Sequence, residues 1–261
     1  MFDTKQYKLH KIFDQLIMYK SFYKDLSFGV FPLISTGTKA IFNIDSYIYS
    51  SIEGTLDSIY QLLSIGRIND SYALLRKFYD AVIVNIYCDL YLNDHFSIDN
   101  TIVDNINNWF IGNKTLPEFK KMNQYIKSHK KLVQINKIID FDGRYKTIRE
   151  NCNNHLHYNS FKIILSNDNE IININRCKLL DQLSSDILNV VIFHIAYIFI
   201  INQHYMRATD YIDSLELGLS PEEGSLYYVA PYIQNMFNET IKKYRPDIEK
   251  VIKDNIDMKI E

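Results

Sequence analysis

The sequence predicts an all-α protein, built as an up-and-down helical bundle. Its 261 residues include only 8 Gly and 5 Pro, and so few helix breakers favour long helices. Apolar residues also recur three and four positions apart through most of the chain, which is the spacing of one helix face. A chain of this length can bury a large core, so we expect residues 1–261 to form a single domain.

Three long helices are predicted in the N-terminal part. Asp3 can cap a first helix over residues 3–26, and the stretch SFGVFPLISTG interrupts the pattern after it. A second helix is expected over residues 38–65, and a third that starts at Asn69 or Asp70 and reaches about Asn93. Gly66 separates them, because glycine readily adopts the left-handed conformation that ends a helix.

Shorter helices and a basic segment follow. We expect a short helix around Trp109 and another that Pro117 opens, since proline fits the first turn of a helix. Between residues 120 and 149 there are nine Lys or Arg against two acids. Such a local excess suits a phosphate backbone, although most charged runs are solvated surface. Gly143 then separates this segment from a helix over residues 145–158.

The remaining chain mixes a predicted hairpin with further helices. The runs FKIIL and IININ flank SNDNE, which predicts a small β-hairpin insertion at about residues 161–175. A very apolar helix over residues 178–206 is expected at the centre of the bundle. Its most apolar run is shorter than the roughly 20 residues of a membrane span, so a single span is only the alternative. Residues 208–261 are predicted to be a helical extension.

Composition narrows the class of function. The net charge of −2 gives no global basic field of the kind typical of non-specific nucleic-acid binders. Cys88, Cys152 and Cys177 are odd in number and widely spaced, which favours a reducing cytoplasm over a disulfide framework. The N-terminus has no signal-peptide pattern, and no glycine-rich phosphate loop is present. We therefore expect a cytoplasmic protein with no cofactor, no metal and no membrane partner.

The candidate site is the run RENCNNHLHYN, residues 149–159. Histidine can accept and return a proton near neutral pH, and the planar arginine fork matches phosphate oxygens. At about 100° per residue, Asn153 lies roughly 40° and His157 roughly 80° from Arg149, so these three can share a face. His155 falls roughly 120° away on the other side.

Two stretches resemble the HEPN superfamily, helical domains that include many metal-independent ribonucleases. Arg149 and His155 are similar to the family's Arg-x(4–6)-His signature, whereas the Asn-rich run CNNHLHYN resembles its surroundings with His157 in the histidine position. The stretch GRINDSYALLRKFYDAVIVNIY resembles a HEPN helix with an arginine and an acid four residues on, here Arg76 and Asp80. A plain surface ion pair is the alternative for these two.

The resemblance implies a HEPN-like homodimer that cleaves RNA as a toxin or anti-phage effector, with an antitoxin or another regulatory partner. His155 or His157 would take the 2′-hydroxyl proton, Arg149 would stabilise charge on the phosphate, and Asn153 would orient it. Further substrate contacts are assigned to Asn154, Tyr158, Asn159, Arg76, Asp80, Arg144 and Lys146.

Three other interpretations of the motif remain open. It could belong to a non-catalytic HEPN-like module that binds a nucleotide or a protein. It could also be a structural homodimer seam, with amides pairing across a two-fold axis. Zinc binding through Cys152, His155 and His157 is the least favoured, because no CxxC or HExxH pattern is present.

Overall fold

A computed structural model describes residues 4–30, 43–97, 102–170 and 175–261. The described chain is mainly helical, as the sequence predicts, and it contains no strand; Arg207 and Val229 form an isolated antiparallel bridge. The helices are α1 (Lys5–Lys8), α2 (Ile12–Gly29), α3 (Ile44–Ser64), α4 (Ile68–His95), α5 (Asp104–Phe110), α6 (Phe119–Ser128), α7 (Val133–Asp142), α8 (Arg144–Leu156), α9 (Phe161–Leu165), α10 (Arg176–Ile201), α11 (Asp210–Glu216), α12 (Pro231–Phe237) and α13 (Pro246–Asn255).

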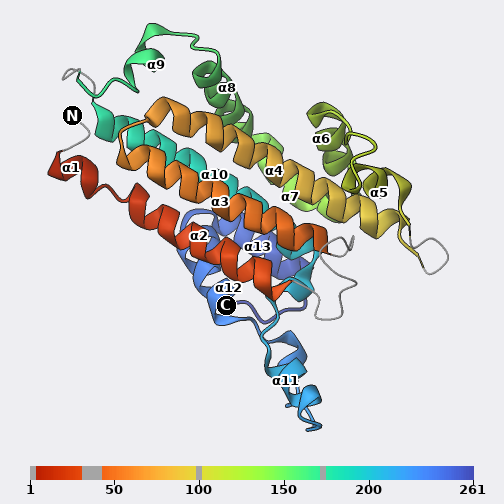
Figure 1. Cartoon of the computed structure of the whole chain (residues 1–261). Coiled ribbons are helices and arrows are strands. Elements are labelled where there is room, and N and C mark those ends of the chain that lie inside the picture. The colour runs from red at the N-terminus through yellow and green to blue at the C-terminus, as the bar shows by residue number, and fades with distance from the viewer. Residues whose placement is uncertain (1–3, 31–42, 98–101, 171–174) are drawn as a thin grey trace.

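Four long helices, α2, α3, α4 and α10, form the centre of the molecule (Figure 1). α3 and α4 are antiparallel because Gly66, at φ 80°, turns the chain between them. α10 instead runs parallel to α2: Ser184 bonds to Gln15 near one end, and His194 bonds to Tyr23 further along both helices. Among these four helices the direction alternates from α2 to α4, and α10 runs in the same direction as α2 and α4.

α10 is the most deeply buried helix of this group. It is long and apolar enough to cross a membrane by length and composition alone, but 83% of its most apolar window is buried inside the protein. Its fully buried His194 is paired, since the ring lies 2.7 Å from the Tyr23 hydroxyl and 2.8 Å from Oδ1 of Asn85. Buried polar groups without such partners would cost free energy.

The predicted β-hairpin at residues 161–175 is not confirmed. Its first arm, FKIIL, is the short helix α9, whose backbone bonds run from Ile163 to Ser160 and from Ser166 to Ile163. Residues 171–174 of the second arm lie outside the described residues. A run of five apolar residues is too short for its periodicity to distinguish a strand from a helix. A strand also needs a neighbouring strand to bond its backbone groups.

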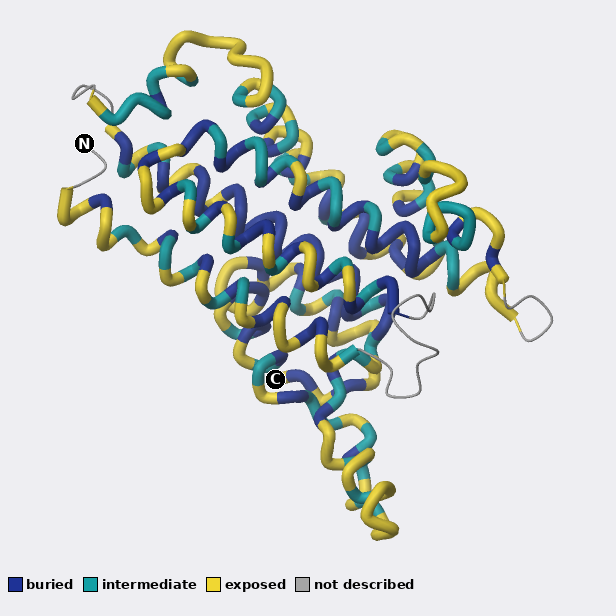
Figure 2. Tube along the Cα trace, in the orientation of Figure 1, coloured by how far each residue is buried: buried dark blue, intermediate teal, exposed yellow. Residues whose placement is uncertain are grey.

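The C-terminal residues 208–261 pack against the bundle. α12 contacts α2, and α13 contacts both α10 and α7. Side chains from Tyr7 to Ile260 belong to one buried apolar cluster. α11 is different, because it projects from the body and its surface is largely exposed (Figures 1 and 2).

Candidate functional site

The polar motif lies on α8, which packs antiparallel to α4. Gly143 at φ 66° ends α7, and α8 begins at the next residue. Near the start of α8, Arg149 contacts Asp80 of α4, whereas near its end His155 contacts Asn69. α8 and α4 therefore run in opposite directions. The two stretches identified in the sequence, residues 149–159 and 66–87, face each other.

Asp80 is the central acceptor of this contact. It lies 2.8 Å from Nη1 of Arg149 and 3.2 Å from Nε of Arg76. Nη1 of Arg76 in turn donates to Oδ1 of Asn153 at 2.6 Å. Four predicted site residues thus form one charge-assisted network, and charged hydrogen bonds of this kind are shorter and stronger than neutral ones.

Phe119 of α6 fixes the other side of the Arg149 guanidinium. The Arg149 Cζ lies 3.2 Å from the centroid of the Phe119 ring, a cation–π arrangement. The side chain of Arg149 remains 23% exposed. Partial burial lowers the pKa of Arg149 from its ordinary value, and the bond to Asp80 opposes that shift. Arginine is charged at any physiological pH in either case.

Arg149 also lines a cavity of about 380 Å³. Its walls come from α4, α6, α7, α8 and α10, and they combine aromatic rings with cations. The aromatic members are Tyr79, Phe119, Tyr145, Phe193 and Tyr197, and the basic members are Lys127, Lys146 and Arg149.

His155 is held against α4 and does not line this cavity. Its ring stacks on Tyr72 with centroids 3.8 Å apart and an interplanar angle of 15°. Its Nδ1 lies 2.8 Å from Oδ1 of Asn69, and this amide oxygen can accept a hydrogen bond from the ring. Burial lowers the pKa of His155 to about 4. The imidazole is therefore neutral at physiological pH and already engaged by two neighbours.

The residues at the end of α8 are exposed. His157 is the C-cap of the helix, and its backbone N–H donates to the carbonyl of Asn153 at 3.0 Å. Tyr158 follows at φ 51°, a left-handed conformation that turns the chain away. Asn159 donates to the Asn154 side chain at 2.8 Å. The exposed side chains here are those of Asn154, His157, Tyr158 and Asn159, and they face solvent rather than the Arg149 network.

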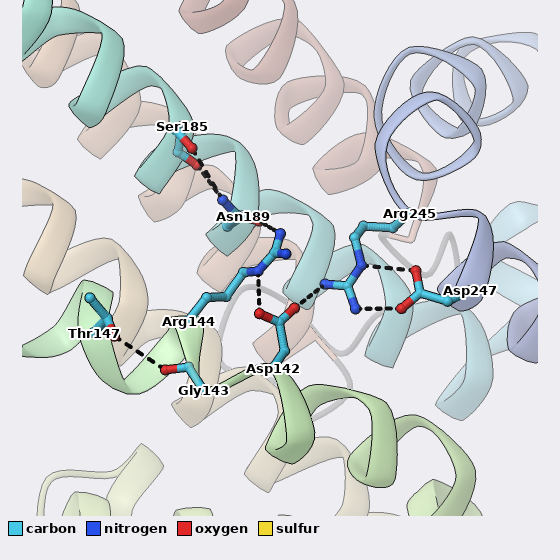
Figure 3. A network of polar contacts seen from close by, with 8 residues as sticks. All are labelled: Asp142, Gly143, Arg144, Thr147, Ser185, Asn189, Arg245 and Asp247. Carbon is cyan, nitrogen blue, oxygen red and sulfur yellow. Dashed lines mark hydrogen bonds and ion pairs between the residues drawn. The ribbon is translucent and has the colours of Figure 1, made fainter.

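Arg144 belongs to a different network (Figure 3). Its Nε lies 2.6 Å from Asp142, and its Nη1 donates to Asn189 of α10 at 2.6 Å. Asp142 also forms an ion pair with Arg245, whose Nη1 lies 3.0 Å from Oδ2, and Arg245 donates two hydrogen bonds to Asp247. Because these contacts join α7, α8, α10 and α13, Arg144 ties helices together and is not placed with the predicted substrate-binding residues.

The basic segment is partly neutralised by local acids. Lys127 pairs with Asp140. Lys146 is 83% exposed, and its Nζ lies 3.8 Å from Glu150, a separation that contributes little on a surface. Lys146 therefore remains a solvated cation beside Arg149 at the cavity.

The cysteines take no part in a metal centre among the described residues. Cys88, Cys152 and Cys177 are unpaired, and burial raises the pKa of the Cys152 thiol to about 12. Within the described ranges, no group of three or more His, Cys, Asp or Glu side chains is placed to hold a metal ion.

Sequence reasoning missed three residues of the site. Asn69 and Tyr72 share a helical stripe with Arg76 and Asp80, so the phase of α4 could have indicated them. Phe119 carried no such signal, because its place over Arg149 depends on how α6 docks. No protein-family model, curated protein or solved structure matches the chain.

Proposed function

We propose that the protein is a metal-independent endoribonuclease of HEPN type, acting in the cytoplasm as a toxin or anti-phage effector. One observation carries the proposal: Arg149 is held between Asp80 and Phe119, and its side chain stays 23% exposed beside a cavity. A fixed, partly desolvated cation is what stabilises charge that develops on a phosphate in a transition state.

In the proposed reaction, His157 takes the proton of the 2′-hydroxyl, and the freed oxygen attacks the adjacent phosphorus. Arg149 stabilises the non-bridging oxygens as the bond between phosphorus and the 5′-oxygen of the next nucleotide breaks. That oxygen takes a proton from water, and His157 gives its own proton back to the solvent. The products are a 2′,3′-cyclic phosphate and a 5′-hydroxyl end. We assign the base to His157 rather than His155, because His157 is exposed and His155 is stacked with a pKa near 4.

The active form is proposed to be a homodimer with two active-site clefts, each of which combines side chains from both copies. Arg149 and His157 are eight residues apart on α8, or about 12 Å of helix rise, and Arg149 is held towards α4 and α6. A two-fold axis near Asn153 would bring Arg149 of one copy to His157 of the other. Exposed apolar side chains beside the end of α8 support a contact there: Leu156, Tyr158, Phe161 and Ile164.

A non-catalytic nucleotide-binding module is the second candidate. One observation favours this candidate: the His155 ring contacts Tyr72 and Asn69 and does not lie beside Arg149. Such a module would keep the Arg149 cation for a phosphate and would need no acid or base. A regulatory partner such as an antitoxin is compatible with either function.

RNA cleavage in EDTA tests the proposal. The wild type should cut total RNA and leave 2′,3′-cyclic phosphate ends, and His157→Ala should slow cleavage by about 10²–10⁴-fold, as loss of a general base does. His95→Ala is the matched control, since His95 is also an exposed histidine in the last turn of a helix. Intact RNA with the wild type, or equal cleavage by His157→Ala, contradicts the nuclease.

A further inference from the structure

The cavity beside Arg149 has the construction of a ligand site. At about 380 Å³ it lies within the range of small-molecule pockets, which is about 300–1,000 Å³. Tyr79, Phe119 and Phe193 contribute aromatic rings from three different helices. Because α4, α6 and α10 all pack into the core, these rings are held by packing rather than by flexible loops.

The polar residues of the cavity have a defined charge. Arg149 and Lys146 are both cationic, and Lys146 is largely solvated. Asn123 of α6 adds an amide that can both donate and accept. The one acid among the lining residues, Asp140, is paired with Lys127. The cavity thus combines aromatic surface with net positive charge.

We propose that this cavity binds one ribonucleotide of the RNA substrate, with its base against Phe119, the one half-buried ring among the aromatic lining residues, and its phosphate towards Arg149 and Lys146. The inference rests on the proposed nuclease function and extends it to a specific nucleotide subsite. Aromatic side chains favour any base, because every base has a π face. The Asn123 amide is the group placed to contact a base edge, in the way that proteins read unpaired RNA bases.

Calorimetric titration with mononucleotides tests the subsite directly. The ligands are the four ribonucleoside 3′-monophosphates, with ribose 5-phosphate as the ligand that has the phosphate and lacks the base. At least one mononucleotide should bind about tenfold or more tightly than ribose 5-phosphate, the equivalent of one base–aromatic contact. If none binds better than ribose 5-phosphate, the inference is wrong.

Two pairs of variants locate the binding. Asn123→Trp places an indole in the cavity and should weaken mononucleotide binding about tenfold or more. Gln124→Trp puts the same side chain at the next, exposed position of α6 and should leave binding unchanged. Should Asn123→Trp fail to fold, Lys146→Glu should weaken binding about fivefold at low salt, whereas Lys121→Glu should not. Equal binding within the folded pair would overturn the inference.

RNA cleavage by the same proteins separates this inference from the nuclease proposal. Base-dependent binding that Asn123→Trp abolishes, with no cleavage by the wild type, would support the subsite and contradict the nuclease. Cleavage by the wild type without base-dependent binding would contradict the subsite and leave the nuclease standing.

Discussion

Asp80 is expected to contribute to stability because one carboxylate serves two guanidinium groups. Asp80→Asn keeps the size of the side chain and removes its charge. Arg149 and Arg76 would then lose their shared anion, with contacts of 2.8 Å and 3.2 Å, and would remain as neighbouring cations. The substitution therefore both weakens two bonds and leaves a repulsion.

The size of the loss follows from the exposure of the network. Hydrogen bonds to charged groups contribute about 1.5–3 kcal/mol when buried, whereas exposed ion pairs contribute about 0–1 kcal/mol. The Asp80 side chain is 42% exposed and that of Arg149 is 23% exposed, so the network lies between these cases. We expect Asp80→Asn to lower the free energy of unfolding by about 1–3 kcal/mol, or the melting temperature by about 3–8 °C.

Urea unfolding measures this loss. In a double-mutant cycle, Asp80→Asn and Arg149→Gln should couple by about 0.5 kcal/mol or more, and the coupling should shrink in 1 M salt. Glu150→Gln is the matched control on the same helix, because its ion pair is longer and more exposed, and it should change stability little. Additive effects of Asp80→Asn and Arg149→Gln would refute the network.

Three further predictions concern burial and pairing. The His155 imidazole should titrate near pH 4 by NMR. Its stabilising contribution is complete above about pH 6.5 and is lost as the pH falls towards 4, because the unfolded chain binds the proton first; a midpoint near 6.5 would contradict its burial. Arg245→Gln should cost about 1–3 kcal/mol in urea unfolding, since Asp142 and Asp247 lose the cation that they share while Asp142 keeps Arg144, and a change below 1 kcal/mol would argue against the network in Figure 3. The Cys152 thiol, with its pKa raised to about 12, should resist iodoacetamide until the protein unfolds, whereas rapid labelling of the native protein would contradict its burial.

The helical fold could be predicted because its signals are local. Scarce breakers and helical spacing indicated the long helices, and Gly66 and Gly143 marked two real boundaries. The near-continuous apolar character of residues 178–206 predicted the central position of α10. Each of these signals depends on neighbours in the sequence, which is why no tertiary information was needed.

The hairpin and the direction of α10 could not be predicted in the same way. FKIIL is compatible with either a strand or a helix, and it formed the helix α9. The parallel course of α2 and α10 depends on the crossover made by residues between α4 and α10, which leaves no periodic signal.

The candidate site was partly predictable. The phase of α8 grouped Arg149 with Asn153, and both belong to the observed network with Arg76 and Asp80. The same phase grouped His157 with Arg149 and separated His155 from it. In the structure His157 faces solvent, and His155 packs against α4 as Arg149 does. That the two polar stretches face each other follows from the antiparallel packing of α4 and α8, and tertiary packing of this kind is not encoded in either stretch alone.

Complementation between inactive variants tests the central claim most directly, since the account places Arg149 and His157 of different copies in one cleft. Arg149→Gln and His157→Ala should each be inactive towards RNA in EDTA. After the two are mixed and allowed to exchange subunits, half of the dimers would be mixed and each would hold one intact cleft, so activity should recover to about a quarter of the wild type. Persistent inactivity of a mixture shown to contain mixed dimers, or full activity of either variant alone, would contradict the account.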